Sequence, residues 1–101
     1  MMRGASPSGL ERGLLALLPD AAIITCRRTA WHSATFSGER VVIQLELAGP
    51  GSASRADAFA AALPEAEFTL RKQFVADILV SDTQLSGETI RLTVDALLLD
   101  E

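Results

Sequence analysis

Two stretches of alternating residues, 41–47 and 89–98, constrain the fold more than any other feature of this chain. In the first, apolar side chains occupy every second position, and Gln44 and Glu46 lie between them. Successive side chains of a strand point to opposite faces, so each stretch is predicted to be a strand with one buried face and one exposed face. Such strands are typical of an antiparallel sheet that is covered on one side.

Two further stretches, 21–29 and 74–80, are rich in β-branched residues and are also predicted to be strands. The first carries Arg27 and Arg28 in its second half, which is therefore expected to be an edge or an exposed segment. The second contains Asp77, which we interpret as an edge-strand charge that discourages unwanted pairing, in preference to a catalytic carboxylate. The turn residues at 81–82 and 86–87 are expected to break this run, which then forms a hairpin or meander with 89–98.

Two amphipathic helices are predicted around these strands. The first begins at the capping-box spacing of Ser8 and Glu11, and the second at Ser54, three residues before Asp57. Apolar residues follow at intervals of three and four, namely Leu10, Leu14, Leu17 and Leu18, and then Ala56, Phe59, Ala60 and Leu63. The order α-β-β-α-β-β predicts the α+β class, with a mainly antiparallel sheet and two helices packed on one face.

Length and charge restrict the possible functions. A chain of 101 residues suits one domain, which we assign to 8–101 after a flexible lead-in at 1–7. The formal net charge of −4 argues against nucleic-acid binding, although the basic pairs at 27–28 and 71–72 could converge in space. Apolar runs far shorter than about 20 residues and the lack of a signal-peptide pattern predict a cytoplasmic protein with no membrane partner.

His32 is the one imidazole of the chain, so any histidine-based catalysis would have to use it. Its hydroxyl neighbours are Ser33, Thr35 and Ser37, but adjacent strand residues point to opposite faces, and the G-x-S-x-G elbow is missing. We therefore expect His32 to be a surface residue at a strand end or turn, and we expect no catalytic residues.

No metal or cofactor is expected. Cys26 and His32 would lie about 20 Å apart along a strand, and two ligands fall short of a structural zinc site. Cys26 is therefore predicted to be a buried structural residue. The segment 49–52 is interpreted as a loop that ends a strand, in preference to a phosphate-binding loop, because no phosphate-binding motif is present.

The run from Trp31 to Glu39, the alternating strand 41–47 and the helix start at 54–58 together resemble the tail-completion (head–tail joining) proteins of tailed bacteriophages and gene-transfer agents. The similarity covers about residues 31–98. Two positions depart from the family pattern, which has Ser at the place of His32 and His at the place of Arg40. The resemblance implies a small α+β protein that assembles as a ring, with no catalytic residues to transfer.

The sequence thus favours a non-enzymatic interaction or assembly domain that forms a homo-oligomer or binds another protein. Self-association is expected through a sheet edge or through surplus apolar surface. Leu97 and Leu99 are the candidate interface, because their phase in the last strand is opposite to the core set. The alternative is a module that binds a small molecule or peptide in a pocket lined by Trp31, Phe59 and Phe74. Trp31 is otherwise expected to pack in the core.

Overall fold

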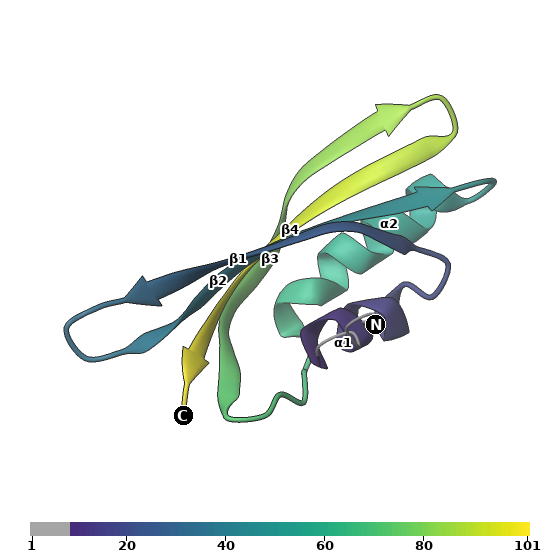
Figure 1. Ribbon diagram of the computed structural model, residues 1–101. Helices are drawn as coiled ribbons and strands as arrows, with labels where there is room; N and C mark the ends of the chain where they lie inside the picture. The colour runs from purple at the N-terminus through teal and green to yellow at the C-terminus, as the bar shows by residue number, and fades with distance from the viewer. Residues whose placement is uncertain (1–8) are drawn as a thin grey trace, which may run out of the picture.

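The structure, a computed structural model, describes residues 9–101. Its elements are α1 (Gly9–Leu17), β1 (Ala22–His32), β2 (Ser37–Ala48), α2 (Ser52–Ala62), the 3-10 helix η1 (Leu63–Glu65), β3 (Gln73–Ser86) and β4 (Thr89–Asp100). The predicted α+β class and element order are confirmed (Figure 1). The lead-in at 1–7 and the cap at Ser8 lie outside the described residues.

The four strands form one antiparallel sheet in the order β1-β2-β4-β3. The two strands with strict alternation, β2 and β4, occupy the centre, and β1 and β3 are the edges. The edge positions predicted for the 21–29 strand and for Asp77 are therefore confirmed. Both helices lie on the same side of the sheet, and the β1–β2 and β3–β4 hairpins project beyond them at opposite ends (Figure 1).

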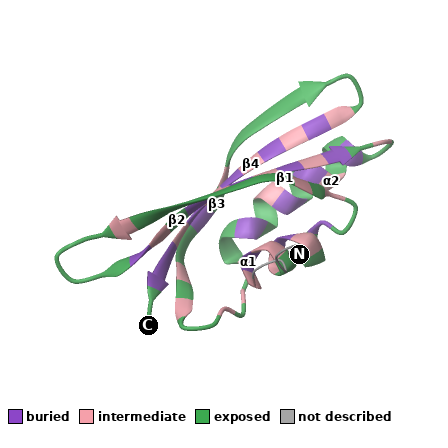
Figure 2. Cartoon of the chain, in the orientation of Figure 1, coloured by how far each residue is buried: buried purple, intermediate pink, exposed green. Residues whose placement is uncertain are grey.

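The core lies between the helices and the central strands. Figure 2 shows the alternation of buried and half-buried positions along β4. Leu10 and Leu14 of α1 and Ala56 and Phe59 of α2 are buried in it. From the two central strands it takes Val41, Ile43, Leu45, Leu47, Ile90, Leu92, Val94, Ala96 and Leu98. Each large side chain buried here stabilises the fold by about 1.5–3 kcal/mol before entropy is counted.

The third strand does not end where the sequence suggested. The turn residues at 81–82 remain within β3, which continues to Ser86, and the register with β4 shifts between Val80 and Asp82. A β-bulge leaves one residue unpaired and so accommodates a turn-forming residue without ending the strand. The chain reverses at residues 87–88, at the second pair of predicted turn residues, where Gly87 has φ of 61°.

The second helix begins at Ser52, two residues before the predicted cap. Gly51 holds the N-cap position with φ of 80°, and no side chain caps the helix. The Arg55 amide donates to the Gly51 carbonyl at 3.0 Å and so closes the first turn. Because glycine adopts this left-handed conformation at little cost, it starts the helix earlier than Ser54 would.

Within residues 9–101, no helix is both long and apolar enough to cross a membrane.

Candidate interaction surface

One face of the sheet carries no helix among the described residues, and we call it the outer face. We use the word row for a set of paired residues that crosses the four strands. In the most apolar row of the outer face, Trp31 pairs with Gly38, Gly38 with Leu99, and Leu99 with Phe74. Paired residues of antiparallel strands place their side chains on the same face. The row therefore brings Trp31, Leu99 and Phe74 to one end of the outer face.

The neighbouring rows extend this apolar region. Leu97 lies between Arg40 and Asp77, and Asp95 lies between Val42 and Leu79. We define the outer patch as the apolar residues of these three rows: Trp31, Val42, Phe74, Leu79, Leu97 and Leu99. Most of an antiparallel sheet's uncovered face is polar, so a contiguous apolar group on it marks a surface that binds something.

Leu97 and Leu99 lie on the face opposite the core set, as their phase in the sequence predicts. Their exposure differs from expectation, since Leu99 is 8% exposed without a second layer over it. Phe74 and Leu79, at 42% and 40%, present more apolar surface to solvent. Any partner of the outer patch would therefore meet these two side chains of β3 first.

The sequence did not reveal Leu79 as a surface residue of this patch. Phe74 and Leu79 are an odd number of positions apart, so a regular strand would place them on opposite faces. The register shift between Val75 and Asp77 reverses the phase and brings both to the outer face. Val42 could have been identified, because it lies in the outward phase of the strand at 41–47.

The charges of the outer face are unevenly distributed. Two arginines are compensated across neighbouring strands. Arg40 lies 3.5 Å from Asp95, and Arg91 lies 2.6 Å from Glu46. Among residues 9–101, no hydrogen bond or ion pair involves the side chains of the three other charged residues on this face, which are Arg27 in β1 and Asp77 and Asp82 in β3. One edge of the face therefore carries a free positive charge, and the opposite edge carries free negative charges.

The predicted pocket of Trp31, Phe59 and Phe74 is not brought together. Phe59 is 3% exposed and lies in the core on the helix side, while the pairing register places Trp31 and Phe74 on the outer face. The sheet separates them. Trp31 is half-buried outside the core, so the expectation that it packs there was wrong, because its phase in β1 points away from the helices.

Phe59 does line a groove of its own, of about 310 Å³, between the end of α1 and α2. Its apolar wall includes Leu17 and Leu18, and Arg55 and Asp20, 3.5 Å apart, lie at its rim. The Arg55 Nε is buried without a hydrogen-bond partner among the described residues. The groove suits one apolar side chain or a small apolar group.

His32 lies at the end of β1, exposed as expected. Its Nδ1 is 3.2 Å from the Ser37 Oγ, at the base of the β1–β2 hairpin. The loop between them is closed by the Ser33 amide, which donates to the Phe36 carbonyl at 2.8 Å. In the described part of the chain, no group of three or more His, Cys, Asp or Glu side chains could hold a metal ion.

Cys26 is exposed on β1, which corrects the prediction of a buried thiol. Its phase in β1 points to the helix side, where it pairs with Ile43, but the edge position leaves it open to solvent. Partial burial raises the pKa of the Cys26 thiol, and the negative charge of Glu11 raises it further, while Arg28 lowers it. The thiol is thus less reactive than an ordinary surface cysteine at neutral pH.

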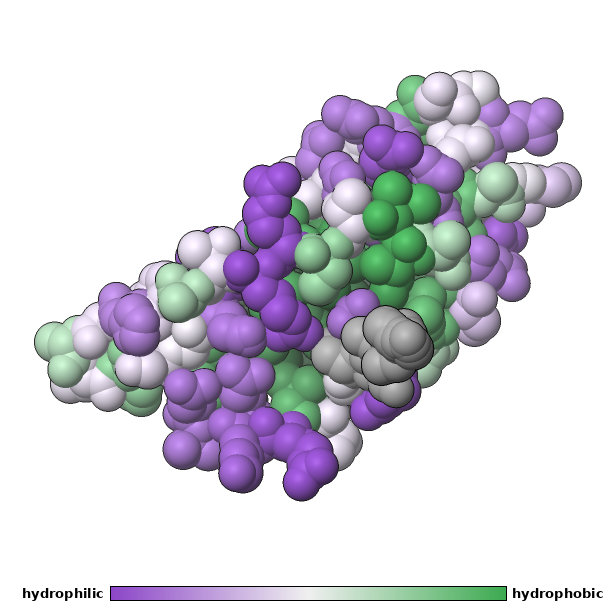
Figure 3. Space-filling view, in the orientation of Figure 1, coloured by the Kyte–Doolittle hydropathy of each residue, from purple (hydrophilic) through white to green (hydrophobic). Residues whose placement is uncertain are grey.

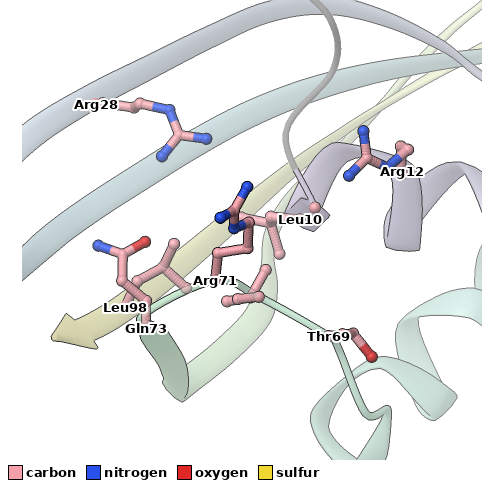
Figure 4. A pocket seen from close by; sticks show the side chains of 9 residues that line it. Leu10, Arg12, Arg28, Thr69, Arg71, Gln73 and Leu98 are labelled. Carbon is pink, nitrogen blue, oxygen red and sulfur yellow. The ribbon is translucent and has the colours of Figure 1, made fainter. Parts of the chain in front are cut away.

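One arginine of each basic pair lies at a shared cavity, whereas Arg27 lies on the outer face. Arg28 and Arg71 both line a cavity of about 300 Å³, with Arg12 at its edge and Leu10 and Leu98 among its apolar walls (Figure 4). The charge of Arg28 is compensated there, because its guanidinium lies 3.0 Å from Glu39 and 3.8 Å from Glu11.

On the face seen in Figure 3, hydrophilic side chains cover most of the surface, and one group of hydrophobic side chains lies near the middle. On this face, contiguous apolar surface is thus confined to one area.

No protein-family model matches this chain, and no curated protein is similar to it. Among solved structures, the fold is similar to a chain in the virion of a native gene transfer agent particle, with a TM-score of 0.57 and 16% sequence identity. The similarity covers 85% of this chain and 84% of that chain. At this identity, the likeness shows that the two chains share a fold.

Proposed function

We propose that this chain is a non-enzymatic structural protein of a phage-like particle and acts as an oligomer, in the manner of a tail-completion protein. The observation that carries the proposal is the outer patch, an apolar group on a sheet face that no described helix covers. A monomer gains nothing from exposing Phe74 and Leu79, whereas a subunit that assembles buries them against its partner.

Two similarities support the particle assignment. The shared fold is found in a gene transfer agent virion, and it extends over most of both chains. Independently, the residues from Trp31 to 58 resemble tail-completion proteins. We place this assembly in the cytoplasm.

The non-enzymatic part of the proposal rests on how the polar side chains are distributed. Histidine catalysis needs a base that is oriented by a second group and directed at a reacting atom. His32 is exposed at a hairpin, and its described partner is the Ser37 hydroxyl. Within residues 9–101, neither of these two side chains makes a further side-chain hydrogen bond, and His32 lines neither of the cavities described above.

The second candidate function is a small-molecule or peptide-binding module. The groove beside Phe59 favours it, since that groove is mainly apolar and has a charged rim of Arg55 and Asp20. Titration with an apolar fluorescent probe tests it. Saturable binding that Ala62→Trp abolishes, in a protein that stays monomeric, would favour this module over the assembly protein.

The first test of the assembly proposal is the absolute mass in solution, by light scattering on a sizing column over a range of protein concentrations. We expect a concentration-dependent oligomer that Leu97→Glu weakens. Leu85→Glu is the matched control, because Leu85 is 73% exposed and lies away from the outer patch. A monomer at every concentration would contradict self-association.

Electron microscopy of the purified oligomer tests the particle role. Closed rings of uniform size are expected for a tail-completion protein. Irregular aggregates, or a mass that Leu97→Glu and Leu85→Glu change equally, would count against it.

A further inference from the structure

We infer that two copies of this chain pair through their outer faces, about a two-fold axis that runs parallel to the strands between β2 and β4. This inference rests on the proposed self-association and specifies one contact of it. Because a two-fold contact closes at two copies, a ring of such pairs is joined through further contacts outside the outer patch. In this pair, the outer patch of one copy contacts the outer patch of the second copy.

The sheet edges are poorly suited to pairing, which leaves the face as the better contact. The edge strand β1 has a register shift between Ile23 and Thr25, and β3 has two shifts along its length. Bulges twist an edge away from a regular ladder, and charges on an edge discourage the addition of another strand. Asp77 and Asp82 supply such charges on β3.

The row order of the outer face fits this axis. Rotation about it lays β1 of one copy over β3 of the other and keeps every row at its own height. Trp31 then meets Phe74 of the second copy. Leu99 meets Gly38 of the second copy, where no side chain projects from β2. Sheets packed face to face in this aligned way keep their mean strand directions within about 30° of each other.

The free charges fit the same axis. Arg27 lies on β1 in the row between those of Thr25 and Thr29, at the height of Leu79 on β3. In the pair it lies over Leu79 of the second copy, between Asp77 and Asp82 of that copy. Because the axis is two-fold, this contact occurs twice, and charges that are free in one copy become compensated.

The competing axis lies across the strands, and the charges do not fit it. A two-fold axis across the strands reverses the strand direction of the second copy. The apolar row of Trp31, Leu99 and Phe74 in one copy would then approach the polar rows at the other end of the second copy's sheet. Those rows contain the Arg91–Glu46 pair and Gln84. It would also stack Arg27 on the same edge of both copies, which places like charges together.

A charge-exchange experiment tests the pairing by equilibrium ultracentrifugation. Arg27→Glu alone, and the double variant Asp77→Lys with Asp82→Lys alone, are each expected to weaken dimerisation at least about tenfold, because like charges then meet at both contacts. An equimolar mixture of the two is expected to form mixed dimers with near wild-type affinity. Arg71→Glu, an exposed charge outside the outer face, is the matched control and leaves dimerisation unchanged.

Phe74→Glu provides the apolar counterpart. We expect it to abolish the dimer over the concentration range in which Leu85→Glu leaves it intact, while circular dichroism shows that both variants remain folded. Mixtures that fail to restore association, or equal effects of Phe74→Glu and Leu85→Glu, would overturn the face-to-face pair.

The results separate this inference from the proposed function. An oligomer that forms normally in Arg27→Glu and Phe74→Glu overturns the face-to-face pair and leaves self-association standing. A wild-type protein that is monomeric at all concentrations overturns both.

Discussion

At Gly38 the two central strands come so close that a side chain has no space. A Cβ atom there would meet the backbone carbonyl oxygen of Leu98 and the Cα of Leu99. Neither atom belongs to a flexible side chain, so β2 and β4 would have to separate to make room. This glycine is required by contact between strands, since its φ is not in the left-handed region.

Gly38→Ala is therefore expected to destabilise the protein by about 1–3 kcal/mol, the usual range for overpacking in a close-packed site. Urea unfolding followed by circular dichroism measures this loss. Gly87→Asn is the contrasting variant, because Gly87 has φ of 61° with open space around it, and asparagine tolerates that conformation. Gly87→Asn should lower the free energy of unfolding by less than about 1 kcal/mol. An equal loss in both variants would contradict the steric account.

The Cys26 thiol reports the charges around it. Removing a negative charge stabilises the thiolate, so Glu11→Gln is expected to lower the Cys26 pKa and speed alkylation by iodoacetamide at pH 8. The increase should remain below about tenfold, since tenfold corresponds to a whole pKa unit. Glu39→Gln is the control and should have a smaller effect, because Glu39 raises this pKa least of the groups involved.

At the scale of the elements, the strands with regular alternation were predictable and those with bulges were not. The 41–47 and 89–98 stretches revealed their buried faces directly, because every second residue is apolar. Alternation breaks down in β3, where shifts near Ala76 and Ser81 reverse the phase. A bulge depends on pairing with another strand, so the neighbourhood of Phe74 and Leu79 is a property of the sheet and not of the local sequence.

The helix starts differ in a similar way. The stripe of α1 was predictable from leucine spacing, and Leu10, Leu14 and Leu18 are buried accordingly. The start of α2 depended on the backbone of Gly51, for which Ser54 was a poor guide. Leu97 could be identified as a candidate interface residue from the alternation of the last strand alone. The unpaired charges of the outer face could be located only from the pairing register of the four strands.

Packing of α1 on the sheet can be tested with two leucines of the same helix. Leu14 is fully buried, whereas Leu17 is 41% exposed. Leu14→Ala is expected to cost about 3 kcal/mol, through lost burial and the cavity left behind. Leu17→Ala should cost about 1 kcal/mol or less. Urea unfolding measures both, and similar losses would show that α1 is loosely docked.

At the scale of the whole molecule, pairing of two copies couples folding to concentration. A native dimer is stabilised by mass action, so a tenfold rise in protein concentration should raise the Tm by roughly 2–5 °C for a domain of this size. Differential scanning calorimetry at several concentrations measures this. Phe74→Glu should give a Tm that does not change with concentration. A constant Tm in the wild-type protein would argue against a dimer in this range.

The position of β2 beside β4 also determines how the sheet has to form. The β1–β2 hairpin turns within residues 33–36 and the β3–β4 hairpin within residues 87–88, so each is a local structure. The central seam instead joins Gly38 to Leu99 and Ala48 to Thr89, across the whole length of α2. Contacts between distant residues are slow to form, so we expect docking of the two hairpins to limit the folding rate. A cut at Pro50 would then leave two fragments with one complete hairpin each, and their reassembly would occur along this seam.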